Sequence, residues 1–137
     1  MALYEYITHV ENIHRKRVAI ETEERELTMP IITNIDKIGD IYNIYSDEIA
    51  KIGIKLHSID GRRIFIFLVI RLFCPAVYTG SKLKRGIRDR IAEVIGCEAS
   101  IISHDFRNLT FHYKKYRSFR NTVNAIYDSV METLSEN

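Results

Sequence analysis

The chain lacks the features that would mark a membrane-spanning or secreted protein. The longest apolar run covers residues 64–70 and is about seven residues long, against the ~20 that a membrane-spanning helix needs. The N-terminal segment lacks the basic start, apolar core and small-residue cleavage site of a secretory signal. We therefore expect a cytoplasmic protein that does not span a membrane.

Cysteine is scarce, and the usual motifs of metal and phosphate chemistry are missing. The two cysteines, Cys74 and Cys97, lie far apart among apolar neighbours, which favours free buried thiols over a disulfide or a metal site. The sequence has no glycine-rich phosphate loop, no metal-ligand spacing of Cys or His and no nucleophile elbow. We expect no metal and no cofactor, and nothing in the sequence predicts an enzyme.

Charge is divided unevenly along a chain of ordinary globular composition. Residues 1–60 contain seven Lys or Arg and eleven Asp or Glu, a net charge of −4, whereas residues 61–137 contain thirteen and seven, a net charge of +6. Such a split is typical of a basic surface for a polyanion beside an acidic module, although two solvated faces of one domain would also produce it.

The N-terminal half predicts two helices. Residues 2–27 contain no Gly or Pro and many good helix formers, so they predict a long helix that ends before Pro30. Beyond Pro30, apolar residues recur at alternating spacings of four and three, which is a heptad seam. We predict a helical hairpin over residues 1–57, and the seam is equally compatible with a homodimer interface formed by Ile31, Ile35, Ile38, Tyr42, Tyr45 and Ile49.

The C-terminal half, residues 58–137, predicts further helices. Residues 62–73 have the β-branched and aromatic content of a strand, but no partner strand is evident, so we predict a buried helix that stops near Cys74 and Pro75. Ser81 is a possible cap for a helix over residues 82–95, which Gly96 ends. A further helix begins near Glu98, with inner-face residues as far as Tyr113, and a last one covers residues 119–134. The predicted class is all-α.

The segment over residues 88–106 resembles the helix-turn-helix of bacterial and phage regulators. Ala92 matches the small residue where the two helices approach, Gly96 the turn glycine, and Ile102 the β-branched plug between the helices, followed by an exposed Ser103. Asp105 departs from the pattern, because the family has an apolar residue there. It would lie near phosphates unless it reads a cytosine amino group or pairs with a neighbouring arginine.

The resemblance implies double-stranded DNA as the partner and a recognition helix in the major groove. The residues it implies for base contacts are Ser100, Ser103, His104, Arg107 and Asn108, of which the last two best suit guanine and adenine. Cations before and after that helix are predicted to contact phosphates, namely Lys82, Lys84, Arg85, Arg88, Lys114 and Lys115, in a basic stretch that continues to Arg117 and Arg120.

The function predicted from the sequence is therefore that of a small transcriptional regulator acting as a dimer. A phage or mobile-element factor that processes DNA would use the same fold, and the sequence does not separate the two. A protein-interaction adaptor, whose helix-turn-helix has become a docking surface, is an alternative of another class. Salt-dependent retention on DNA separates the adaptor from both.

Overall fold

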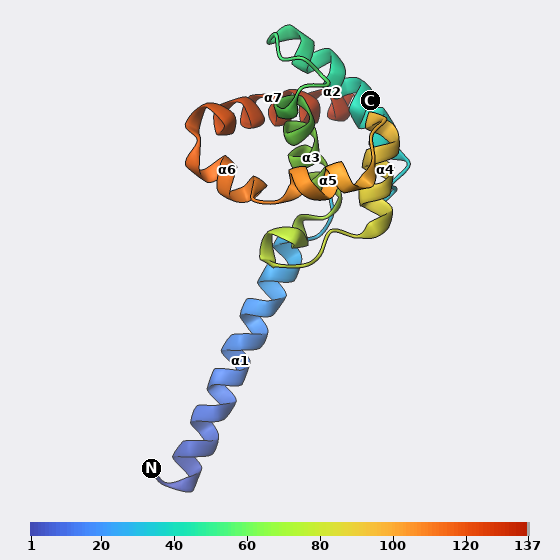
Figure 1. Ribbon diagram of the computed structural model, residues 1–137. Helices are drawn as coiled ribbons and strands as arrows, with labels where there is room; N and C mark the ends of the chain where they lie inside the picture. Colours follow the sequence, from blue (N-terminus) through green and yellow to red (C-terminus); the bar gives the residue numbers. More distant parts are fainter. Residues whose placement is uncertain (137) are drawn as a thin grey trace.

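The computed structural model describes residues 1–136 and confirms the all-α class. Within that part of the chain there is no strand, and no helix has both the length and the apolar character needed to cross a membrane. The elements in chain order (Figure 1) are α1 (Leu3–Leu27), α2 (Lys37–Lys51), α3 (Ile59–Phe73), the short 3-10 helix η1 (Pro75–Thr79), α4 (Arg85–Ile95), α5 (Ala99–Phe106), α6 (Leu109–Lys115) and α7 (Arg117–Glu136).

Helix α3 is the centre of the core, as the apolar stretch at residues 62–73 predicts. Ten of its fifteen residues are buried. The Ser58 side chain accepts a hydrogen bond from the Gly61 amide and caps the N-terminus, and Cys74 followed by Pro75 ends the helix. A helix buried on nearly every side carries no amphipathic pattern, so its sequence reads as a continuous apolar run.

The heptad seam of residues 31–52 packs inside the same chain. Helix α2 lies against α7, α4 and α3, and its Tyr45 hydroxyl donates a 2.6 Å hydrogen bond to the Gly61 carbonyl at the start of α3. Ile38, Tyr45 and Ile49 are at most 1% exposed, and Tyr42 is half-buried. These four therefore face the chain's own core, and only Ile31 and Ile35, in the connector before α2, are exposed, so the predicted dimer interface is wrong for most of its residues.

Helix α1 matches the predicted long helix but not the predicted hairpin. It buries none of its residues, and Figure 1 shows it projecting from the body that α2–α7 form. The chain after it is tied to the body, because the amides of Ile31 and Ile32 both donate to the Leu72 carbonyl at the end of α3. The predicted unit of residues 1–57 is therefore not one structural unit, because α2 contributes to the core of the body whereas α1 contributes no buried residue.

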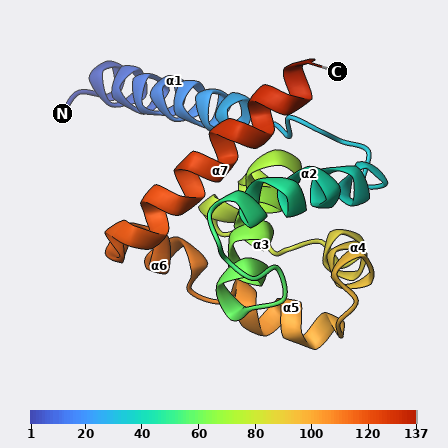
Figure 2. The same ribbon diagram turned by 90° about the horizontal axis from the view of Figure 1, so that it is seen from above.

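The chain closes around α3 through α4, α5, α6 and α7, which Figure 2 shows arranged about it.

The predicted single helix beginning near Glu98 is wrong. Asn108 has a φ of 61° and Arg107 is extended, so the chain turns between α5 and α6. Two other boundaries move: α4 begins at Arg85 without a Ser81 cap, and α7 already begins at Arg117.

Candidate nucleic-acid interface

Helices α4 and α5 form a tightly joined pair. Three residues, Gly96 to Glu98, connect them, and Gly96 adopts a left-handed conformation with φ of 85° that favours glycine. Ala92 of α4 and Ile102 of α5 are 5% and 0% exposed, respectively. The two helices run steeply across each other (Figure 1), and both pack on α3. The predicted roles of Ala92, Gly96 and Ile102 thus fit the local geometry.

The Asp105 side chain is buried and is already paired with a cation of α3. Its carboxylate accepts a 2.8 Å hydrogen bond from Nε of Arg62, which comes from α3. The Asp105 side chain is 4% exposed and that of Arg62 is 22% exposed. The sequence left Asp105 either near phosphates, against a cytosine amino group or paired with an arginine, and the structure shows the pair with an arginine. An ion pair satisfies the carboxylate where the resemblance places an apolar residue.

The outward face of α5 is formed by Ser100, Ile101 and His104, all exposed, with Ser103 half-buried at its edge. A shallow groove of about 400 Å³ runs beside this face. Arg62 and Cys97 line its other side. Ile101 was missed by the sequence analysis, because a residue next to the plug Ile102 can be assigned outward only when the rotation of the helix is known.

Arg107 and Asn108 do not lie on α5, which corrects their assignment to the recognition helix. Both are exposed and follow its last residue, Phe106. A hollow of about 150 Å³ places them beside Val77 and Tyr78 of η1. Their side chains therefore leave the body at the α5–α6 junction and not along the outward face of α5.

The cations before and within α4 are partly neutralised. Lys82 and Lys84 are exposed and enter no ion pair within residues 1–136. Arg85 and Arg88 both lie near the Asp89 carboxylate, at 3.7 and 3.2 Å. Such exposed pairs are weak, so both guanidinium groups can exchange Asp89 for another anion.

The cations after α5 are more open to an anion. Residues 106–127 contain no Asp or Glu. In the part of the chain that the structure describes, no salt bridge neutralises the basic residues of this stretch, which are Arg107, Lys114, Lys115, Arg117 and Arg120.

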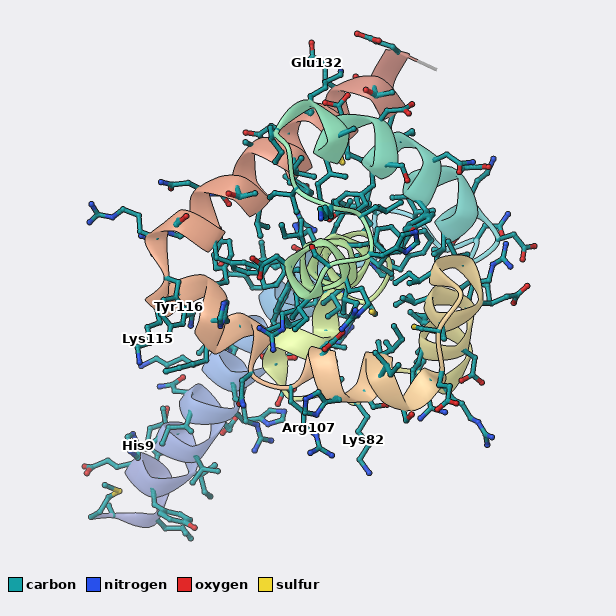
Figure 3. All side chains as sticks on the ribbon, turned by 45° about the horizontal axis from the view of Figure 1, so that its top comes forward. His9, Lys82, Arg107, Lys115, Tyr116 and Glu132 are labelled. Atoms are coloured by element: carbon teal, nitrogen blue, oxygen red, sulfur yellow. The ribbon has the colours of Figure 1, made fainter. Side chains whose placement is uncertain are left out.

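Two exposed aromatic rings accompany these cations. Phe111 and Tyr116 are 60% and 46% exposed, and the Lys115 ammonium lies 5.4 and 5.5 Å from their ring centroids. Figure 3 shows Lys82 and Arg107 projecting from one edge of the body and Lys115 and Tyr116 farther round it.

The two cysteines are free thiols, of which Cys74 is buried and Cys97 half-buried. Burial raises the pKa of Cys74 to about 11, and burial also raises the pKa of Cys97, next to the α4–α5 turn. A thiolate is the reactive form, so neither side chain is prepared for nucleophilic chemistry at neutral pH. Within residues 1–136, no three side chains of His, Cys, Asp or Glu come together as they would around a metal ion.

Comparison with known protein families, with curated proteins and with solved structures finds no match to this chain.

Proposed function

We propose that this protein binds double-stranded DNA through α4 and α5, with α5 in the major groove, and acts as a small regulator. The observation that carries the proposal is the α4–α5 pair itself: a three-residue turn with a left-handed Gly96 and a buried plug at Ile102. Two helices joined in this way on a supporting helix are the scaffold that helix-turn-helix proteins use to present one helix to a groove.

The outward face of α5 supplies the base contacts. Ser100 and His104 offer polar atoms, and Ile101 offers an apolar surface for a thymine methyl group. Asp105 is held away from the phosphates by its pair with Arg62, whereas the exposed N-cap residue Glu98 leaves one carboxylate beside this face, where it accepts from the Ser100 hydroxyl at 3.5 Å. Ser103 contributes from the edge of the face.

The cations on both sides of α5 supply phosphate contacts. Lys82 and Lys84 precede the pair, while Lys114 and Lys115 follow it in the acid-free stretch. Because phosphate contacts provide affinity without sequence information, their density matters more than their identity. We assign Arg107 to this second group, since it lies beyond the last residue of α5. Asn108, which leaves the body at the same junction, is assigned with it.

The two kinds of contact are tested on a duplex selected from a random DNA pool. Ser100→Ala and His104→Ala should each cost roughly 1–3 kcal/mol on that duplex and relax base preference, with little change on a scrambled duplex. The double variant Lys114→Ala/Lys115→Ala should weaken both duplexes alike and reduce the salt slope by about two.

Lys37→Ala is the matched control. Lys37 is an exposed cation on α2, paired with Asp40 at 3.7 Å, and should leave both affinities unchanged. If the α5 variants lose no discrimination and the lysine variants leave the salt slope unchanged, the groove assignment fails. Protein docking through the same pair of helices then becomes the better explanation.

A further inference from the structure

Helix α1 is a long helix that packs against no other element closely enough to bury a residue within residues 1–136. None of its 25 residues is buried, and both Figure 1 and Figure 2 show it leading away from the body. An isolated helix is only marginally stable in water, since helices in proteins gain most of their stability by packing an apolar face. An exposed helix of this length is therefore expected to pack an apolar face against another surface.

Six of the apolar side chains of α1 fall on one heptad seam, which also contains Arg17 and Glu24, whereas Tyr4, Ile7 and Val18 lie outside it. Positions spaced alternately by three and four carry Leu3, Tyr6, Val10, Ile13, Arg17, Ile20, Glu24 and Leu27. The six apolar members are between 46% and 73% exposed. An apolar stripe of this length is characteristic of a helix that packs against another helix by knobs-into-holes contacts.

We propose that this seam binds the α1 helix of a second copy of the chain in an antiparallel two-stranded coiled coil. A heptad seam is complementary to another seam of the same spacing, so an identical helix satisfies it through a two-fold axis. A membrane surface is the less suitable occupant. Residues 3–27 contain six Glu and four Lys or Arg, and a net charge of −2 is repelled by anionic lipids.

The charged members of the seam determine the direction of the second helix. In a parallel pair Arg17 would face Arg17 of the second copy, and Glu24 would face Glu24, so like charges would meet within the seam. In an antiparallel pair with Leu3 level with Leu27, Arg17 faces an isoleucine, Ile13. Glu24 then faces Tyr6, whose hydroxyl can donate to the carboxylate.

The antiparallel pair places the two bodies at opposite ends of a rod about 37 Å long, from 25 residues at a rise of about 1.5 Å each. The proposal concerns assembly alone and does not depend on DNA binding, so it is tested in the absence of nucleic acid.

The assembly is tested by sedimentation of the full chain. The wild-type protein should sediment as a dimer of 16.0 kDa chains. Ile13→Asp/Ile20→Asp should sediment as a monomer, because it would bury charge in the seam. Val18→Asp is the matched control: Val18 is an apolar α1 residue, 44% exposed, outside the seam, and its variant should remain a dimer.

Thermal melting verifies that the body of each variant is folded, since neither Ile13 nor Ile20 belongs to its core. A monomeric wild-type protein, a dimeric Ile13→Asp/Ile20→Asp variant or a monomeric Val18→Asp variant would overturn the proposal.

The direction of the helices is tested with a short thiol crosslinker. A mixture of Tyr6→Cys and Glu24→Cys chains should form mixed crosslinks. Neither variant alone should crosslink to itself, because two copies of position 6 lie about 27 Å apart in the antiparallel pair. The wild-type chain, which retains Cys74 and Cys97, measures the background. Self-crosslinking of either variant above this background would show a parallel pair and contradict the proposed direction.

Discussion

Asp105 shows how a carboxylate can be accommodated inside a pair of packed helices. The resemblance of this segment to helix-turn-helix sequences predicts an apolar side chain at this position, whereas the structure has a carboxylate whose side chain is 4% exposed. Arg62 compensates for it across 43 residues of sequence. A buried carboxylate is tolerated when a cation and a hydrogen bond accompany it. The pair also ties α5 to α3, which holds the outward face of α5 in place.

Removing this carboxylate should destabilise the body. Asp105→Ala leaves the Arg62 guanidinium, 22% exposed, without its partner. We expect a loss of roughly 2–4 kcal/mol in the free energy of unfolding, somewhat less than for a fully buried pair because Arg62 reaches solvent. Chemical denaturation measures it.

Asp89→Ala is the comparison, since the Asp89 side chain is 50% exposed and its pairs with Arg85 and Arg88 lie at the surface. It should change the stability by less than about 1 kcal/mol. Equal losses in the two variants would mean that the Asp105 pair is no more important to stability than a surface pair.

At this scale the sequence predicts what is local. Gly96 could be assigned to the turn that ends a helix, from its place directly after an apolar periodic segment. The partner of Asp105 could not be chosen, because the chain has thirteen Lys or Arg in residues 61–137 and the fold alone selects among them. The sequence also does not show that Ile101 faces outward, because the rotation of α5 is fixed only by its packing in the fold.

At the level of the helices, Gly61 and Gly86 have different surroundings, so an alanine at the two positions is expected to have opposite effects on stability. A Cβ atom at Gly61 would lie 2.5 Å from the backbone oxygens of Lys55 and Leu56, where the connector crosses the start of α3. A Cβ atom at Gly86, in the first turn of α4, would meet nothing within 4 Å. One glycine is required by close packing and the other is not.

Alanine substitutions should therefore separate the two. Gly61→Ala should lower the melting temperature. The added methyl group would push the connector away and would distort the hydrogen bond from the Tyr45 hydroxyl to the carbonyl of residue 61. Gly86→Ala should leave stability unchanged or raise it by up to about 1 kcal/mol, since alanine favours a helix. A Gly61→Ala variant as stable as the wild type would contradict the packing described for α3.

Element type was more predictable than element boundaries. The absence of any partner strand identified α3 as a helix despite its strand-like composition. The break between α5 and α6 was not predictable, because the apolar spacing from Ile102 through Phe106 and Leu109 to Tyr113 continues as in one helix. The extended Arg107 and the positive φ of Asn108 separate them.

At the scale of the whole molecule, periodicity shows which surface must be covered but not by what. The seam in α2 is covered by the chain's own α7, α4 and α3, whereas the seam in α1 stays exposed in the part of the chain that the structure describes. Both have heptad spacing. The difference follows from where the core closes, which the sequence does not show, so the heptad spacing of residues 31–52 predicted a dimer interface at a seam that the chain's own core covers.

DNA binding through α5 between two groups of cations is tested by titrating salt on a selected duplex. Four to six phosphate contacts per protomer predict that log K falls with log salt at a slope of about −4 to −5 per protomer, with a selected duplex bound more tightly than a scrambled one at every salt concentration. A slope near zero, or equal affinity for the two duplexes, would contradict the account.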